Sequence, residues 1–440
     1  MDYQHLEEQD SEIYDLIKKE EQRQKEGLEL IPSENYVSPA VLETIGSILN
    51  YKYAEGYPGR RYYAGNQYID EVEKLAQVRA REVFQANDYH INVQPLSGSP
   101  ANLAVYWGLL EPGDTILALK LEEGGHLTHG SAVNFSGRTF KFVFYPLAKD
   151  ETLDYEAVRK LAREHKPKLI LSGYTAYPRT IDFKKFHKIA KEIGAISMAD
   201  ISHISGLVIG GVHPSPFPFT DVVTTTTHKT LRGPRAAIIF CKPEYKEQID
   251  KAVFPGMQGG PHEHTIAGIA VALKEAATPE FKNYAEQIVK NSKALAETLI
   301  VEELKLVAGG TDNHLMLIDL RPFGPGRGIF IEKALEAAHI TVNKTTVPGD
   351  TATPFYPSGI RLGPPAVTSR GMKEGEMTQA GKLIARIVKE FATTELPDDK
   401  EKRSAAVKEF VAKLKNHPVI KEVKVAVMKL SRQFPVPGIE

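Results

Sequence analysis

The sequence has almost no cysteine. Cys241 is the only thiol in 440 residues. No disulfide can form within the chain, and a structural zinc site built on several thiolates is excluded. We therefore expect a protein of a reducing compartment and predict a cytoplasmic location.

Long apolar runs are also missing. The longest, such as Ala236–Cys241, are far shorter than the roughly 20 residues that cross a bilayer. Residues Met1–Asp10 are acidic and polar, without the basic start and apolar stretch that mark a signal peptide. The sequence thus predicts a soluble protein with no membrane partner.

Charge of one sign is not in excess. Lys and Arg number 55, Asp and Glu number 56, and the formal net charge is −1. Such a chain has no overall positive field, so we expect no nucleic-acid partner. The length predicts two or three domains, or one large α/β body with a satellite.

What the sequence does contain is an alternation of short apolar runs with helical patterns, from about residue 92 to residue 240. The runs are Thr115–Leu119, Leu169–Ser172, Ala195–Ala199, Asp221–Thr225 and Ala236–Phe240. The helical patterns between them include Tyr155–His165 and Phe183–Ile193. This alternation predicts an α/β fold with a mostly parallel sheet covered on both faces. Such sheets bind ligands at the carboxyl ends of their strands.

The two ends of the chain have different patterns. Ile13, Leu16 and Ile17 recur at helical spacing and predict an amphipathic arm. A long helical pattern covers His264–Ile300 and is interrupted near Pro279. Beyond residue 300, a short strand over 314–319 mixes with helices over 329–338, 374–391 and 401–416. We therefore predict an arm over 1–27, a large domain over 28–280, and an inter-domain helix with a small α+β domain over 281–440.

The run Val222–Thr227 is rich in β-branched residues and predicts a strand that ends on His228 and Lys229. A lysine at a strand end in a threonine-lined crevice can be desolvated, which lowers the pKa of its amine and makes it a nucleophile. A solvated surface lysine is the alternative that this segment alone leaves open.

A second candidate is the acid that follows the apolar run Ile196–Ala199. Asp200 ends this run, and His203 comes three residues later. A carboxylate buried at a strand end needs a partner such as Lys, Arg, a metal or a protonated pyridine nitrogen, whereas a loop cap is the plainer alternative. An Asp for the pyridine nitrogen and a Lys for a Schiff base are two demands of pyridoxal phosphate.

The third demand of that cofactor is a phosphate cup. Ser97, Gly98 and Ser99 precede the helical pattern Ala101–Leu110. Small residues let the backbone approach a phosphate, and a helix N-terminus offers unpaired N–H groups. A plain serine N-cap is the alternative for this motif alone. The serine N-cap becomes the weaker explanation because all three demands of the cofactor occur in one α/β domain.

Two segments are too polar and too rich in turn residues for a core. Tyr51–Tyr63 holds five tyrosines, two arginines and Glu55. Gly124–Gly130 places His126 and His129 in a glycine-lined loop, where an imidazole can stack on a flat ring or cap a helix.

Two further features fit the same chemistry. The glycine loop Gly256–Pro261 suits a second phosphate contact, and Arg361 at the end of a predicted strand suits bidentate pairing with a substrate carboxylate. A surface arginine is the alternative for Arg361.

Together these motifs carry a resemblance to a known family. They read LIPSEN, KYAEGYPGRRYY, NVQPLSGSPAN, GGHLTHGS, ADISH, VVTTTTHKTLRGPR, FPGMQGGP and SGIRLG. From about Leu28 to Phe391 the chain resembles the serine hydroxymethyltransferases, which are pyridoxal-phosphate enzymes of fold type I. The resemblance implies an aspartate-aminotransferase-like large domain with a smaller α+β C-terminal domain.

The resemblance also implies an activity. L-serine and tetrahydrofolate would be converted reversibly to glycine and 5,10-methylenetetrahydrofolate. Cleavage of β-hydroxy amino acids would be a side activity, and no metal is implied. Lys229 would form the aldimine with pyridoxal phosphate, and Asp200 would pair with the pyridine nitrogen. The other cofactor-binding positions would be Ser97, Gly98, His126, Thr175, His203, Tyr53, Gly259 and Gly260.

The family pattern places substrate and catalytic roles on a few positions. The substrate-binding positions would be Ser33, Arg361, Tyr63, His203 and Glu55. The catalytic positions would be Lys229, Glu55, His228, Tyr63 and Thr226. The folate-binding positions would be Leu121, Gly125, His126, Leu127, Thr345, Thr353, Pro354 and Phe355. Tyr53, Glu55, Gly259 and Gly260 would reach the site of a neighbouring subunit, which implies a homo-oligomer with a dimer as the minimum active unit.

Some positions depart from the family pattern. Thr175 stands where Ser is usual, and Glu122 and Glu123 stand where an Ala-His pair is frequent. Thr345 stands where family members commonly carry Asn, and its single hydroxyl cannot give the two-point contact of an amide. A modified pterin is therefore an alternative to tetrahydrofolate.

Two other functions compete with the transferase. A folate-independent threonine or allo-threonine aldolase has less need of Glu55 and the tyrosines around it. A non-catalytic scaffold would be free to lose Lys229, Asp200 and Arg361, which are all present.

Overall fold

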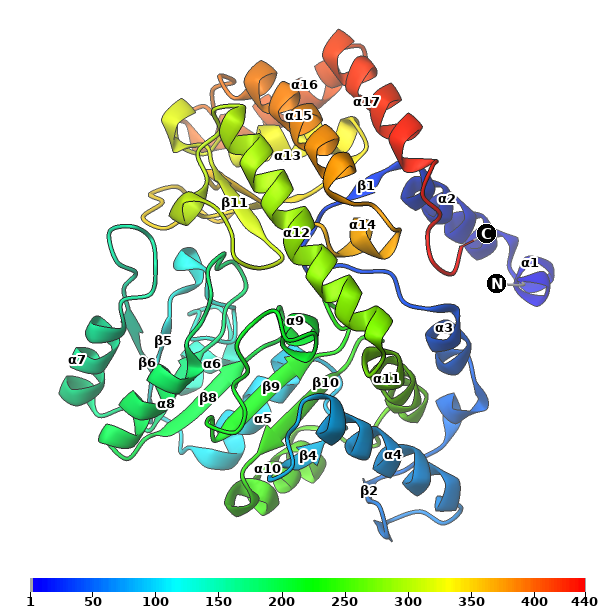
Figure 1. Cartoon of the computed structure of the whole chain (residues 1–440), viewed down its shortest axis with the longest axis vertical. Coiled ribbons are helices and arrows are strands. Elements are labelled where there is room, and N and C mark those ends of the chain that lie inside the picture. The colour runs from blue at the N-terminus through cyan, green and yellow to red at the C-terminus, as the bar shows by residue number, and fades with distance from the viewer. Residues whose placement is uncertain (1–2, 440) are drawn as a thin grey trace. The chain divides into compact units, whose positions relative to one another are not determined.

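The computed structural model describes residues 3–439, and the chain divides into two compact units (Figure 1). Unit 2 runs from Ala40 to Glu286, and unit 1 combines the residues up to Pro39 with those from Gln287 onward. The domain boundaries predicted after residues 27 and 280 stay predictions. No helix among the described residues has the length and apolar character needed to span a bilayer.

The centre of unit 2 is a seven-stranded sheet in the order β4-β10-β9-β8-β7-β5-β6. The strands β6, β5, β7, β8 and β9 run parallel, whereas β10 pairs antiparallel with β9 and β4. Their bounds are β4 His90–Asn92, β5 Thr115–Leu119, β6 Lys141–Tyr145, β7 Leu169–Ser172, β8 Ile196–Asp200, β9 Val222–Thr226 and β10 Ala237–Cys241. The prediction of an α/β fold with a mostly parallel sheet is confirmed.

Helices pack against this sheet and begin at recognisable caps. Asp154 accepts a hydrogen bond from the backbone N–H of Ala157 at the start of α7, and Asp182 accepts one from Lys185 at the start of α8. Both helices begin where the sequence pattern predicts. The helices of this unit are α4 Gln67–Val83, α5 Gly98–Leu109, α6 Phe135–Thr139, α7 Tyr155–His165, α8 Phe183–Glu192, α9 Ser205–Ile209, α10 Lys246–Lys251 and α11 Glu263–Ala276.

Unit 1 is built on small sheets with helices. The strands β13, β14 and β11 form an antiparallel sheet, and β1 pairs parallel with β12. Their bounds are β1 Leu28–Glu29, β11 Met316–Asp319, β12 Ile340–Thr341, β13 Asn343–Thr345 and β14 Gly359–Leu362. The helices are α1 Gln4–Gln9, α2 Ser11–Glu26, α13 Gly328–Ala337, α14 Pro365–Ser369, α15 Glu374–Phe391, α16 Lys400–Leu414 and α17 Pro418–Ser431. Two helices, α3 Pro39–Ile45 and α12 Pro279–Val301, include residues of both units. The short strands β2 Gly56–Tyr57 and β3 Arg60–Arg61 form a hairpin in unit 2.

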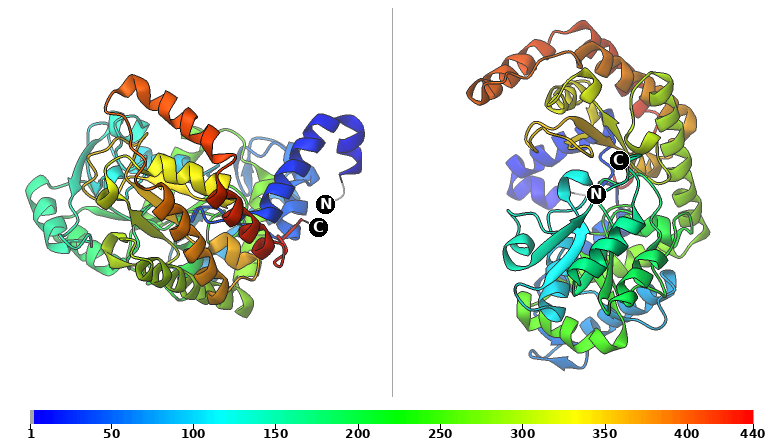
Figure 2. Two further views of the ribbon diagram at one scale, coloured as in Figure 1. Left: turned by 90° about the horizontal axis from the view of Figure 1, so that it is seen from above. Right: turned by 90° about the vertical axis from the view of Figure 1, so that its left-hand side faces the viewer.

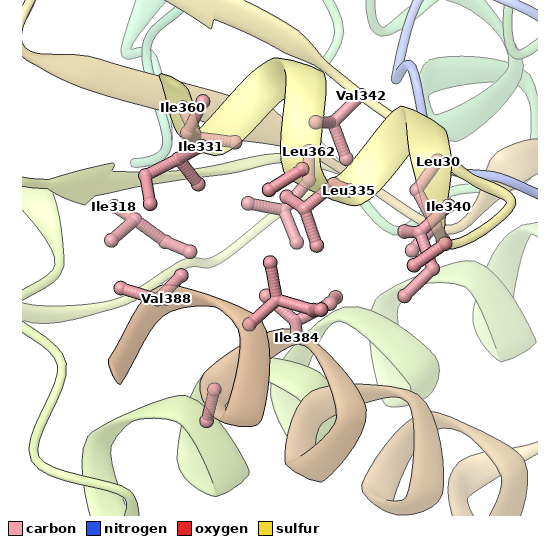
Figure 3. Packing of buried hydrophobic residues seen from close by; sticks show 14 of the residues in the cluster. Leu30, Ile318, Ile331, Leu335, Ile340, Val342, Ile360, Leu362, Ile384 and Val388 are labelled. Atoms are coloured by element: carbon pink, nitrogen blue, oxygen red, sulfur yellow. The ribbon is translucent and has the colours of Figure 1, made fainter. Parts of the chain in front are cut away.

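An aliphatic core holds unit 1 together. Figure 3 shows Ile331 and Leu335 of α13 facing Ile384 and Val388 of α15, with strand residues such as Ile360 beside them. These side chains are fully buried, and burying each one contributes about 1.5–3 kcal/mol. The short strands and the helices therefore share one core.

The N-terminal arm is tied into unit 1 by one buried arginine. Arg370 donates to the backbone carbonyls of Gly27 at 2.8 Å and of Ser431 at 2.6 Å. A surface ion pair joins Arg432 to Glu26 at 2.8 Å. Figures 1 and 2 show the result, with α2 lying beside the end of α17.

Candidate active site

The site begins where two neighbouring strands end. The strands β8 and β9 are parallel, with Asp200 opposite Thr224, so their carboxyl ends meet at one edge of the sheet. A cavity of about 240 Å³ lies there. The predicted site residues that line it are Ser97, Gly98, His126, Thr175, Asp200, His203, Thr226, His228 and Lys229. Residues far apart in the sequence are therefore brought to one place by the sheet.

Asp200 is an almost fully buried carboxylate in this cavity. Asn102 Nδ2 donates to Asp200 Oδ2 at 2.8 Å, and the backbone N–H of Ser202 donates to Oδ1 at 3.0 Å. Burial by itself raises the pKa of Asp200, but His129 and these hydrogen bonds outweigh burial and hold the pKa well below its ordinary value. Asp200 is therefore ionised at physiological pH.

His129 is a neighbour of Asp200 to which the sequence reasoning gave no role. Its Nε2 lies 3.5 Å from Asp200 Oδ2, and its Nδ1 accepts a hydrogen bond from the backbone N–H of His126 at 3.2 Å. Because Nδ1 accepts, the proton of a neutral ring sits on Nε2, which faces the carboxylate. The glycine-lined loop was a signal for the pair of histidines, but it could not show which one contacts Asp200.

Asn102 is a contact of Asp200 that the sequence did not predict. Thr224 Oγ1 donates to Asn102 Oδ1 at 2.7 Å, which orients the amide so that its N–H groups face Asp200 and Thr128. Asn102 is buried within α5. Nothing in the sequence distinguishes this asparagine from any other polar residue in a helix, so no signal was there to find it.

The start of α5 forms the corner of the cavity predicted to hold phosphate. Ser97 precedes the helix in an extended conformation, and its side chain makes no capping hydrogen bond. A Cβ on Gly98 would lie 2.7 Å from Thr226 Cγ2, so a larger residue has no room there. The helix therefore begins at the cavity with unpaired N–H groups and its positive dipole end.

His228 and Lys229 directly follow β9. Burial, helped by the positive charges of Lys229 and Arg235, lowers the pKa of His228 to about 3. Its Nδ1 is buried and has no hydrogen-bond partner among the described residues. The imidazole beside Lys229 is therefore neutral at physiological pH.

The loop after β5 holds positions that the sequence predicts to face the cofactor ring and the pterin. His126 Nδ1 lies 2.8 Å from Thr128 Oγ1, which anchors the imidazole. The predicted pterin residues Leu121, Gly125 and Leu127 lie in the same segment, and a Cβ on Gly125 would collide with the Leu119 carbonyl at 2.3 Å. The Leu127 side chain is 44% exposed and open to a ligand.

Other predicted residues of unit 2 do not line this cavity. Tyr53 and Tyr63 contact each other, with ring centroids 5.2 Å apart, and both are exposed. A Cβ on Gly259 would lie 3.4 Å from Glu55 Oε1, and one on Gly260 would lie 3.6 Å from the Tyr53 ring. The structure thus brings these five residues together as a second cluster.

Unit 1 carries the remaining predicted residues. Arg361, at 7% exposure, donates from Nη2 to Ser33 Oγ at 3.3 Å and from Nε to Asn343 Oδ1 at 3.0 Å. Burial lowers the pKa of Arg361 to about 10, against the opposite effect of Glu34, so the guanidinium stays charged at physiological pH. Asn343, which sequence reasoning missed, orients it.

The predicted pterin positions of unit 1 lie in the sheet that contains Arg361 and in the loop after β13. Thr345 lies on β13 opposite Gly359. Thr353, Pro354 and Phe355 form part of the following loop, where the Phe355 side chain is 80% exposed.

No group of three or more His, Cys, Asp or Glu side chains within residues 3–439 is arranged to hold a metal ion. The polar groups of the cavity are a lone carboxylate, imidazoles, hydroxyls, the Lys229 amine and the Arg235 guanidinium.

Comparison with known proteins gives a consistent result. A family model described as serine hydroxymethyltransferase matches residues 6–384. A curated protein named serine hydroxymethyltransferase, from Desulfotalea psychrophila (strain LSv54 / DSM 12343), is 53% identical over 435 residues. That alignment covers 99% of this chain and 96% of the relative.

Proposed function

The chain belongs to the serine hydroxymethyltransferase family, and on that premise we propose which of its residues carry the reaction. The family depends on pyridoxal phosphate and transfers the hydroxymethyl group of serine to tetrahydrofolate, leaving glycine. The folate-independent aldolase is not favoured, because both comparisons name the transferase.

The residues of the cavity fit this cofactor. Gly98 leaves the start of α5 open for a phosphate, and Asp200 supplies an ionised carboxylate that would pair with a protonated pyridine nitrogen. When bound, pyridoxal phosphate supplies a protonated ring that accepts the electron pair released as a bond to the substrate α-carbon breaks. Asp200 holds the proton at the ring nitrogen, and His129 and Asn102 hold Asp200.

Lys229 supplies the amine that links the cofactor to the chain. His228, neutral at physiological pH, adds no positive charge beside that amine. Ser97 and Gly98 would hold the phosphate, His126 would stack on the ring, and Thr175 and His203 would lie near its phenolic oxygen. Thr226, which we assign a catalytic role, lines the same cavity.

Arg361 binds the carboxylate of serine or glycine. A guanidinium that is charged and buried gains more from a carboxylate than an exposed one does, because little water competes for its N–H groups. Ser33 and Asn343 hold the guanidinium by its Nη2 and Nε atoms, which fixes its plane.

The second cluster completes the site of a neighbouring subunit. Tyr53, Glu55, Tyr63, Gly259 and Gly260 lie together but do not line the cavity of their own chain. Exposed tyrosines beside a glycine loop are typical of a surface that a partner covers. We propose a homodimer in which Glu55 moves the proton of the serine hydroxyl and Tyr63 helps bind the substrate.

The positions that we assign to folate binding are Leu121, Gly125, His126, Leu127, Thr345, Thr353, Pro354 and Phe355. Thr345 offers one hydroxyl, so its contact with the pterin has a single point. We place the enzyme in the cytoplasm, supported by its single buried cysteine.

The observation that carries this proposal is the buried, ionised Asp200 in one cavity with Lys229. The test is the visible absorbance of the purified protein with pyridoxal phosphate and glycine, before and after tetrahydrofolate is added, together with serine turnover. A cofactor band that changes strongly on addition of folate, and turnover that requires folate, are expected. Serine turnover without folate would favour the aldolase, and the absence of any cofactor band would overturn the site.

A further inference from the structure

Glu55 is half-buried in a polar segment, and hydrogen bonds hold the backbone around it. Asn66 Nδ2 donates to the Tyr53 carbonyl at 3.3 Å, and the backbone N–H of Tyr62 donates to the Glu55 carbonyl at 3.0 Å. Arg61 Nη1 donates to the carbonyls of Ala54 at 2.7 Å and of Gly56 at 2.9 Å. Four consecutive carbonyls around Glu55 therefore have fixed donors.

Arg61 is the centre of this arrangement. Its side chain is only 4% exposed, although it lies in a two-residue strand of a surface hairpin. The guanidinium also pairs with α4, through Nε to Asp70 at 2.8 Å and through Nη2 to Glu73 at 2.7 Å. Its planar fork thus joins the two carbonyls that flank Glu55 to two carboxylates of one helix.

Gln94, next to the central sheet, holds the same stretch of backbone. It follows β4, is fully buried, and donates from Nε2 to the Gly56 carbonyl at 2.9 Å and to Glu73 at 3.1 Å. Gly56 has a φ of +97°, and a Cβ there would lie 2.3 Å from the Arg60 carbonyl. The turn that follows Glu55 is therefore held by two donors and tolerates only glycine.

We propose that Arg61 and Gln94 are positioning residues that fix the carboxylate of Glu55 for proton transfer in the neighbouring subunit. This inference rests on the proposed function of Glu55. The buried ion pair of Arg61 with Glu73 ties the polar, turn-rich segment around Glu55 to helix α4, and Gln94 ties the same segment to the central sheet. Glu55 therefore keeps one direction near Gly259. A displacement of about 1 Å of a catalytic group can lower turnover about 100-fold.

The test uses Arg61→Lys and Gln94→Leu in the full-length enzyme with its cofactor. Lysine keeps the charge but has no fork to reach two carbonyls and two carboxylates, and leucine keeps the volume of Gln94 without its donors. Arg60→Ala, at the exposed neighbouring position of the same hairpin, is the matched control. We expect kcat for serine to fall by about 10- to 100-fold in both variants, with the KM for serine and the cofactor absorbance unchanged and the control at wild-type rate.

A double-mutant comparison separates positioning from general stability. In a Glu55→Gln background, Arg61→Lys and Gln94→Leu should cause no further loss, because the group that they position has already gone. Full turnover in both single variants would overturn the inference, and so would additive losses or a parallel loss of cofactor absorbance. A wild-type rate for Glu55→Gln itself, or a wild-type chain without folate-dependent turnover, would instead overturn the proposed function and this inference with it.

Discussion

At the scale of single residues, the charge state of Asp200 decides what the cavity can hold. A carboxylate taken out of water ordinarily becomes neutral, because burial raises its pKa. Hydrogen bonds from Asn102 and from the backbone of Ser202, one to each oxygen, and the His129 imidazole 3.5 Å away reverse that tendency. The negative charge therefore persists in the cavity, as our proposal for Asp200 requires.

Asp200→Asn keeps the shape of the side chain and removes its charge. We expect serine turnover to fall by about 100-fold or more, since a protonated ring would no longer be held. Steady-state kinetics with saturating cofactor measure this effect. A near-normal rate would mean that Asp200 is only a structural acid.

Lys229→Ala should abolish the visible absorbance band of the covalently linked cofactor, because the linking amine is removed. Lys242→Ala is the matched control, since Lys242 also directly follows a buried strand but lies outside the cavity lining. Absorbance spectra of both variants after addition of pyridoxal phosphate provide the comparison. An unchanged band in Lys229→Ala would refute the assignment of the lysine.

Residue chemistry made part of this site predictable from sequence. Asp200 ends an apolar run and Lys229 follows a run of β-branched residues, and a charged residue at the end of a strand is unusual enough to be noticed. Asn102 and His129 carry no such mark, because their importance lies in contacts with Asp200 across the fold. Their roles became visible only through distances.

At the scale of elements, α11 begins with a buried acid. Glu263 lies in its first turn, and neither of its carboxylate oxygens has a hydrogen-bond partner among the described residues. Burial, followed by repulsion from Glu73, raises the pKa of Glu263 to about 8, while Arg61 acts in the opposite direction. The helix dipole favours a charge here by about 0.3–1 kcal/mol, which is too little to offset burial.

The sign of the resulting pH dependence follows from the raised pKa. In the unfolded chain Glu263 loses its proton near pH 4.5, but in the folded chain it keeps the proton until about pH 8. Between these values the folded state binds one proton more, so stability falls as pH rises, by about 1.4 kcal/mol per pH unit for this group. Above pH 8 its contribution levels off.

Glu263→Gln should remove this pH dependence, because glutamine has the same shape and no proton to lose. Urea unfolding at pH 6 and pH 9 measures the difference. The variant should gain stability relative to wild type as pH rises, by a few kcal/mol at pH 9. Parallel stability curves for the two proteins would show that Glu263 does not titrate in this range.

Periodicity predicted most elements and missed those that depend on context. The helix α7 has the predicted bounds, and α8, α13 and α15 agree within a residue or two. The direction of β10 could not be predicted, because a buried apolar run looks the same whether its neighbour is parallel or antiparallel. The helix predicted over 401–416 is α16, whereas no element was predicted for the segment of α17, although α17 buries Val423 and Val427 in the core of unit 1.

At the scale of the whole molecule, the second cluster makes a prediction about subunits. Mixing Lys229→Ala subunits with Glu55→Gln subunits, after reversible dissociation, should restore serine turnover that neither variant has alone. About half of the dimers would be hybrids with one of two sites intact, so about a quarter of the wild-type activity is expected. Mixtures that stay inactive, with subunit exchange verified by labelled chains, would show that each site is built from one chain.

The membership of the first 39 residues in unit 1 has a consequence for synthesis on the ribosome. Leu28 pairs with Ile340, so β1 leaves the ribosome long before its partner strand exists. At about 5–20 residues per second, the arm waits tens of seconds, during which unit 2 has all of its own residues available. Leu28 and Leu30 are then exposed apolar residues on a nascent chain, and a chaperone that binds apolar segments has its opportunity in that interval.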